Sequence, residues 1–199
     1  MPRILYAPAS PYSAKARMAA TYAGIAFDSV LTDTNSPSPE FLASNPLGKI
    51  PVFVTDEGDS IYDSRAISQY LNRASRNALL PRNAAKRTEA ERLEALADGI
   101  CDCLLAHVYE RRSRPQEMVQ QAWLDKQWSK AGRALDALNA APPKLPKKIT
   151  VGQIALRACL GYLALRFDGE WERGRSRLVR WAKRFDDKFP ELAALTPRA

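Results

Sequence analysis

NPLGKIPVF, residues 45–53, joins a turn containing proline and glycine to a short apolar run. The run KIPVFVT (49–55) predicts a β-strand. A proline just before a strand makes Ile50–Pro51 a candidate cis peptide bond, because the cis form costs little at proline and turns the chain sharply. An ordinary trans turn proline is the alternative interpretation of Pro51.

Two strands and a helix are expected upstream. RILYA (3–7) predicts a short buried strand, and AFDSVLT (26–32) alternates between apolar and polar residues as a second strand does. Between them, PYSAKARMAATYAG (11–24) predicts a helix, with Pro11 suited to its first position and Gly24 to its end. A short helical turn around EFLASN then leads into NPLGKIPVF.

A hairpin and another helix are expected downstream. DEGD (56–59) predicts the turn and SIY (60–62) a short fourth strand. DSRAISQYLNRAS (63–75) predicts a helix capped by Asp63 or Ser64. The order β-α-β followed by β-β-α is typical of a thioredoxin-like domain.

Strand patterns disappear from residue 85 onward, which predicts an all-α second half. The expected helices lie at 85–112, 116–140, 149–167 and 175–189, with a proline-rich break at 141–148 and Pro190 ending the last helix. The predicted domains are therefore a thioredoxin-like α/β domain at about 1–75 and an all-α domain at about 86–199.

The net charge of +8 arises entirely after residue 80, because acidic and basic residues balance before it. In the second half basic residues alternate with acidic ones, as in RFDGEWERGRSRLVRWAKRFDDKF. This mixture is typical of solvated helix faces, so no nucleic-acid partner is expected.

Composition also bears on the compartment. No window reaches 18 uninterrupted apolar residues and the N-terminal stretch lacks the apolar core of a signal peptide, so we expect a cytoplasmic protein without a membrane partner. The spacing of Cys101 and Cys103 is not that of a redox pair, and His107 is the single histidine. Buried reduced thiols and no metal are therefore expected.

Three motifs occur in a set order: SPYSAKAR (10–17) at the first helix, NPLGKIPVF at the third strand and IYDSRAISQYL (61–71) at the next helix. With an all-helical second half, the chain resembles the cytosolic glutathione transferase superfamily over essentially its whole length. It is most similar to bacterial members that share stretches such as EALADGI (94–100). The resemblance implies glutathione as cosubstrate, conjugation to a small electrophile in detoxification, and a homodimer.

The resemblance also implies a glutathione site. The backbone of Ile50, before a cis Pro51, would pair with the cysteinyl backbone of glutathione. Ser64 would hold the γ-glutamyl carboxylate at a helix N-terminus, and Asp63 its ammonium, although many relatives have the longer glutamate there. Lys49 matches a position close to a glutathione carboxylate. A plain helix cap at Asp63 and Ser64, and an exposed loop lysine, are the alternatives.

Ser10 has two interpretations. Ser-Pro before a helix is a good N-cap followed by a proline at the first position. The resemblance instead implies that the Ser10 hydroxyl donates to the glutathione sulfur and favours the thiolate, helped by the helix N–H groups. Tyr6 and Tyr12 are neighbouring phenols that other classes of the superfamily would favour, and we expect Tyr12 at the surface or on the pocket wall.

The second half of the chain gives fewer predictions about functional residues. TVGQ (150–153) matches the capping box with which family members begin an inner helix, with Gln153 in place of an aspartate. Cys103, His107 and Tyr109 lie on the first long helix, where residues can face the cleft, but a place in the core or at the surface is the favoured interpretation for each.

The sequence leaves other functions open. Other glutathione chemistry, such as peroxide reduction or reductive dehalogenation, is one alternative, and a glutathione-binding or interaction protein without turnover is another. Exchange through a mixed disulfide is disfavoured, because classes that use it carry cysteine where Ser10 stands.

Overall fold

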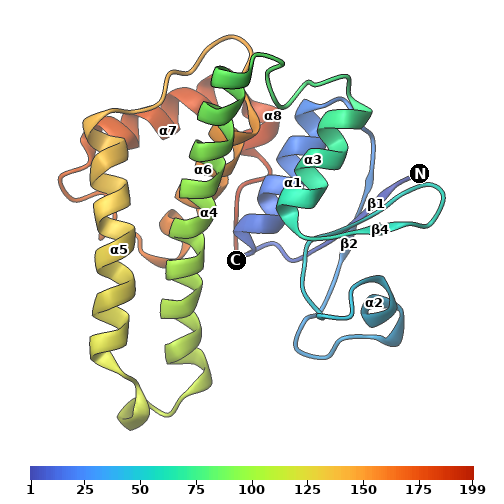
Figure 1. The fold of residues 1–199 in the computed structure, drawn as a ribbon. Coiled ribbons are helices and arrows are strands. Elements are labelled where there is room, and N and C mark those ends of the chain that lie inside the picture. The colour runs from blue at the N-terminus through green and yellow to red at the C-terminus, as the bar shows by residue number, and fades with distance from the viewer.

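The computed structural model describes all 199 residues as a small sheet with flanking helices joined to a helical body (Figure 1). The first part contains β1 (Arg3–Tyr6), α1 (Pro11–Tyr22), β2 (Asp28–Leu31), α2 (Pro39–Ser44), β3 (Val52–Val54), β4 (Ser60–Ile61) and α3 (Ser64–Ala74). The second part contains α4 (Ala84–Ser113), the 3₁₀ turn η1 (Gln116–Met118), α5 (Gln121–Ala140), α6 (Val151–Arg166), α7 (Ser176–Lys188) and α8 (Pro190–Ala193).

The sheet has the order β2-β1-β3-β4, with β1 parallel to β2 and antiparallel to β3. Neighbouring residues of a strand face opposite sides of a sheet. Ile4 and Phe53, paired across β1 and β3, belong to the main core with residues of α1 and α3, whereas Leu5 and Val52 pack with Phe41 of α2. The predicted thioredoxin-like architecture is confirmed.

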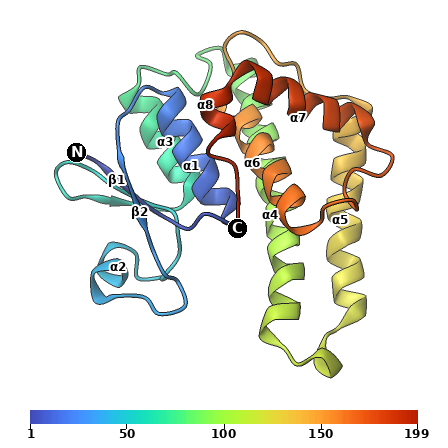
Figure 2. The ribbon, with the colours of Figure 1, turned by 180° about the vertical axis from the view of Figure 1, so that it is seen from behind.

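The helical body is built around α6. Eleven of its residues are buried, so it is apolar on nearly every side, as its sequence predicts. It packs against α4 and also against α1, and so joins the two parts (Figure 2). The capping box is confirmed: the Thr150 hydroxyl accepts from Gly152 N–H at 3.2 Å, and Gln153 Oε1 accepts from Thr150 N–H at 2.8 Å.

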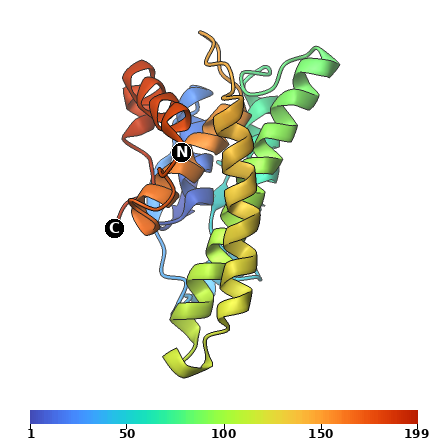
Figure 3. The same cartoon turned by 90° about the vertical axis from the view of Figure 1, so that its left-hand side faces the viewer.

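The helices α4 and α5 form an antiparallel pair whose lower end projects past the rest of the body (Figure 3). Some boundaries differ from the prediction. The helix expected from residue 116 begins as η1, and α5 starts only at Gln121. Pro190 does end α7, but it also occupies the first turn of α8, where a missing N–H costs nothing. The boundaries 1–75 and 86–199 stay predictions.

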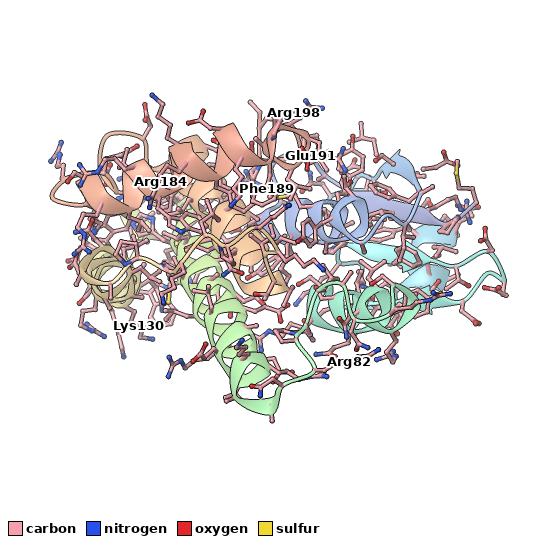
Figure 4. All side chains as sticks on the ribbon, turned by 90° about the horizontal axis from the view of Figure 1, so that it is seen from above. Arg82, Lys130, Arg184, Phe189, Glu191 and Arg198 are labelled. Carbon is pink, nitrogen blue, oxygen red and sulfur yellow. The ribbon has the colours of Figure 1, made fainter.

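Two basic residues of the helical body lie far from the sheet. Figure 4 shows Lys130 and Arg184 on α5 and α7, on the far side of the molecule from the strands. No helix combines the length and the apolar character needed to cross a bilayer.

Candidate functional site

A cavity of about 900 Å³ lies between the two parts of the chain. The first part contributes the loops after β1 and β2, the loop before β3 and the starts of α1 and α3, and the second part contributes α4 and α6. All six residues predicted for the glutathione site line this cavity: Ser10, Lys49, Ile50, Pro51, Asp63 and Ser64.

Ser10 is the N-cap of α1. Its Oγ accepts a hydrogen bond from Ser13 N–H at 3.1 Å, and Pro11 occupies the first helical position. A hydroxyl has two acceptor lone pairs and one donor hydrogen, so capping uses the oxygen and leaves the O–H free to donate. The cap is therefore confirmed, and it does not compete with donation into the cavity.

The loop before β3 is held by a buried asparagine. Asn45 donates from Nδ2 to the Lys49 carbonyl at 2.7 Å, and its Oδ1 accepts from Leu47 N–H at 3.1 Å. The Ile50–Pro51 peptide is cis, as the resemblance to the glutathione transferase superfamily implies. Because the β1–β3 pairing covers only Val52 to Val54 of this strand, the backbone of Ile50 lies outside the ladder, at the cavity.

Asp63 and Ser64 begin α3. Asp63 is the N-cap, and its Oδ1 accepts from Arg65 N–H at 2.9 Å and from Ala66 N–H at 3.5 Å. Its second carboxylate oxygen is not used in this cap. Ser64 is buried in the first turn of α3, where backbone N–H groups and the helix dipole favour an anion.

A buried charge network fixes α1 against α4. Lys15, 1% exposed, donates to Asp98 Oδ1 and Oδ2 at 2.9 and 2.8 Å and to Glu94 Oε1 at 3.1 Å. Arg65 of α3 donates from Nε to Asp98 Oδ2 at 2.8 Å. Burial raises the pKa of Glu94, and the charge of Lys15 opposes that rise. Three helices that border the cavity are thus tied together beside it.

This network was not predicted from the sequence. Its signals are a lysine within an alanine-rich helix and two acids four residues apart in EALADGI, which places both on one helix face. These residues are recognised as partners only in the folded structure, where Lys15 of α1 reaches the two acids of α4.

Tyr12 lies on the wall of the cavity, and its hydroxyl donates to Asp102 of α4. Burial and this hydrogen bond raise the pKa of Tyr12 far above its usual range. The phenol therefore stays protonated, and its single hydrogen is committed to Asp102. Tyr6 is not among the cavity-lining residues, and its ring lies under the Arg17 guanidinium at 4.3 Å.

The far wall comes from the helical body. Leu105, Val108, Tyr109 and Arg112 of α4 line it, with Tyr162 and Arg166 of α6. Of the three residues singled out on the first long helix, Tyr109 alone lines the cavity.

The other two, Cys103 and His107, do not line the cavity. His107 packs against Phe167 and Trp128 with ring centroids 5.3 and 6.5 Å apart, and burial lowers its pKa. The three cysteines are unpaired: Cys101 and Cys159 are buried, but Cys103 is only half-buried, so the expectation of buried thiols is wrong for Cys103.

Comparison with known proteins identifies the family. A family model for the glutathione S-transferase N-terminal domain matches residues 5–78. The uncharacterized GST-like protein YibF of Escherichia coli (strain K12) is 32% identical over 161 residues, which cover 79% of this chain and 79% of YibF.

Two crystal structures share the complete fold. A glutathione S-transferase from Methylobacillus flagellatus KT with bound glutathione has a TM-score of 0.91 and 33% identity, and the match covers 100% of both chains. A glutathione S-transferase from Methylobacterium radiotolerans JCM 2831 in complex with glutathione sulfonate has a TM-score of 0.90 and 30% identity, covering 100% of this chain and 95% of the other. The sequence identity to YibF and the shared fold together show that this chain belongs to the glutathione S-transferase superfamily.

Proposed function

We propose that this protein is a glutathione transferase that binds glutathione as its thiolate and conjugates it to a small electrophile. The observation that carries the proposal is the placement of two serines, Ser10 and Ser64, at the N-termini of α1 and α3 on one cavity. One helix start suits the sulfur anion and the other a carboxylate, because both ends offer free N–H groups and partial positive charge. The glutathione and glutathione sulfonate bound to the two structural relatives support glutathione as the ligand.

Glutathione would be held at its ends and its middle. Ser64 would receive the γ-glutamyl carboxylate, and the unused oxygen of Asp63 would accept from the ammonium. The backbone of Ile50 would pair with the cysteinyl residue, in the manner of a strand added to a sheet edge. Lys49, exposed at the cavity mouth, would contact the remaining carboxylate.

Ser10 is the hydroxyl best placed to stabilise the thiolate. The Tyr12 hydrogen is already donated to Asp102, and Tyr6 does not line the cavity. Ser10 accepts from Ser13 N–H and keeps its own hydrogen, and accepting a bond polarises the hydroxyl as a donor. We therefore assign to Ser10 the hydrogen bond that lowers the pKa of the glutathione thiol.

The reaction follows from that assignment. The thiol proton leaves to solvent, and the sulfur lone pair attacks the electrophilic carbon as the C–S bond forms. In a substitution the leaving group departs with the bonding pair, and in an addition to an activated double bond the adjacent carbon takes up a proton. The Ser10 O–H and the N-terminal amides of α1 hold the sulfur anion until it attacks.

The activity is tested with three measurements on the purified protein. Glutathione conjugation to 1-chloro-2,4-dinitrobenzene, reduction of cumene hydroperoxide by glutathione, and retention on immobilised glutathione are compared. Conjugation supports the proposal. Hydroperoxide turnover without conjugation makes the protein a peroxidase, and retention without either turnover makes it a binding protein.

We also propose that two copies form a homodimer in the cytoplasm, as the resemblance to the superfamily implies. Light scattering coupled to size-exclusion chromatography measures the mass in solution. A mass of one 22.2 kDa chain at micromolar concentration would contradict the dimer.

A further inference from the structure

The charge and polarity of the residues that line the cavity change along α4. Asp98, Asp102, Leu105, Tyr109 and Arg112 follow one another at spacings of three or four residues, so they share one face of the helix, and all five line the cavity. From Asp102 to Arg112 the helix rises about 15 Å, at about 1.5 Å per residue. The face is therefore acidic beside the Ser10 end, apolar in the middle and basic at the far end.

A second helix adds to the basic end. Tyr162 and Arg166 of α6 are one turn apart and both line the cavity. Burial raises the pKa of Tyr162, and the charges of Arg166 and Arg112 oppose that rise. Tyr162 is only 4% exposed, and its pKa is perturbed by burial and by charges, with no hydrogen bond contributing. A buried phenol beside two cations is thus left facing the cavity.

The acids of the cavity do not neutralise these arginines. Asp98 is bound by Lys15 and Arg65, and Asp102 accepts from Tyr12. Asp63 caps α3, and Asp33 accepts from Asn35 N–H at 2.8 Å without an ion pair. The ion pairs of the chain use other arginines: Arg65, Arg87, Arg114, Arg157 and Arg175.

The Arg112 guanidinium lies over the Tyr109 ring at 5.6 Å from its centroid, which holds it at the cavity wall without using its N–H donors. Both Arg112 and Arg166 are exposed at the far end of the cavity. Their donors are therefore open to a ligand.

We propose that Tyr109, Arg112, Tyr162 and Arg166 form a subsite for a carboxylate on the electrophilic cosubstrate, so that the protein prefers electrophiles with an apolar body and an anionic end. A guanidinium matches a carboxylate with two parallel hydrogen bonds, and a phenol can donate a third. Leu105 and Val108 would contact the apolar body between this subsite and Ser10. The proposal rests on the proposed function, because it concerns the second substrate of the same cavity.

Two glutathione conjugates test the subsite by binding alone. S-hexylglutathione and S-(5-carboxypentyl)glutathione have the same chain length and differ only in a terminal methyl or carboxylate. Calorimetry gives the ratio of their Kd values. We expect the carboxylated conjugate to bind more tightly, and this preference to shrink as ionic strength rises, because exposed charges are screened by salt.

Variants test whether the preference for the carboxylated conjugate depends on Arg112 and Arg166. In Arg112→Gln/Arg166→Gln the preference should fall by about five- to tenfold, the range for one or two hydrogen bonds to a charged group on an exposed wall. Arg111→Gln is the matched control, because Arg111 is exposed on the same turn of α4 but does not line the cavity. It removes one positive charge, where the double variant removes two, and should leave the ratio within about twofold, since charges at a distance are screened.

The outcomes separate the two proposals. Equal binding of the two conjugates, or a preference that survives in the double variant, overturns the carboxylate subsite while the glutathione site stands. Failure of both conjugates to bind overturns the glutathione site, and the subsite with it.

Discussion

Lys15 of α1 donates to both carboxylate oxygens of Asp98 on α4, at 2.9 and 2.8 Å, and both side chains are buried. A buried cation is tolerated only when it is paired, so this contact fixes how the thioredoxin-like part and the helical body meet. Ser10 and Tyr12 lie on the same helix as Lys15, and Asp102 lies one turn after Asp98. The geometry of the cavity therefore depends on this pair.

Replacing Lys15 by methionine should destabilise the fold by about 3–5 kcal/mol, because it leaves Glu94 buried without a cation and Asp98 paired with Arg65 alone. Urea unfolding followed by circular dichroism measures the change. Lys15→Met/Glu94→Gln/Asp98→Asn, which removes the stranded charges, should recover part of the loss. A single variant as stable as the parent would show that the network contributes nothing.

Glu94 should make stability depend on pH. Burial raises its pKa in the folded state, so the folded protein holds this proton more tightly than the unfolded chain does. Its favourable contribution is present below the unfolded pKa and is lost as pH rises through the folded value. The free energy of unfolding of the parent minus that of Glu94→Gln should therefore decrease from pH 4 to pH 7. A difference that increases with pH would contradict the assigned direction.

Gly152 allows α6 to approach α4 closely. A Cβ there would lie 2.7 Å from the Ala90 carbonyl oxygen and 2.9 Å from Leu93 Cβ, so Gly152→Ala should cost about 1–3 kcal/mol by overpacking. Gly99→Ala is the matched control, because Gly99 is also helical and nothing lies within 4 Å of its added Cβ. It should be neutral or stabilising by up to about 1 kcal/mol. Equal melting temperatures for the two variants would rule out the close approach.

Ser64→Ala should weaken glutathione binding by about 1–3 kcal/mol, the cost of losing a hydrogen bond to a charged group. Ser68→Ala is a suitable control, since Ser68 is buried one turn later on α3 and donates to the Ser64 carbonyl rather than lining the cavity. Calorimetry that finds unchanged affinity for Ser64→Ala would remove this residue from the site.

Local patterns were enough to predict the fold and the helix caps. The strands, the turn at 56–59 and the caps at Ser10 and Thr150 each depend on residues within a few positions of one another. The local pattern left Pro51 open between cis and trans, and the cis form and the six expected site residues came from the resemblance to the glutathione transferase superfamily. The fold brings these six residues to one cavity.

Long-range pairings were not predictable in this way. The partners of Lys15 lie 79 and 83 residues away in sequence, and the Tyr12–Asp102 bond spans 90 residues. His107 could not be placed from its helix position either, because the packing of Phe167 and Trp128 decides where it lies. The short elements η1 and α8 carry too few residues for a periodic pattern.

The thiolate role of Ser10 is tested most directly by titrating bound glutathione. Ser10→Ala and Ser38→Ala each remove a serine N-cap, of α1 and α2, and each should lose about 1 kcal/mol of stability. Ser38 does not line the cavity, so its variant controls for the lost cap alone.

The measurement is the ultraviolet absorbance of the thiolate against pH in the parent and both variants. We predict that Ser10→Ala raises the pKa of bound glutathione by about one to two pH units, toward the value of a free thiol near 8.5, while Ser38→Ala leaves it at the parent value. At neutral pH the reactive fraction and the turnover should then fall roughly tenfold per unit. A titration curve for Ser10→Ala that superimposes on the parent curve would contradict the account, and would leave Ser10 as a helix cap alone.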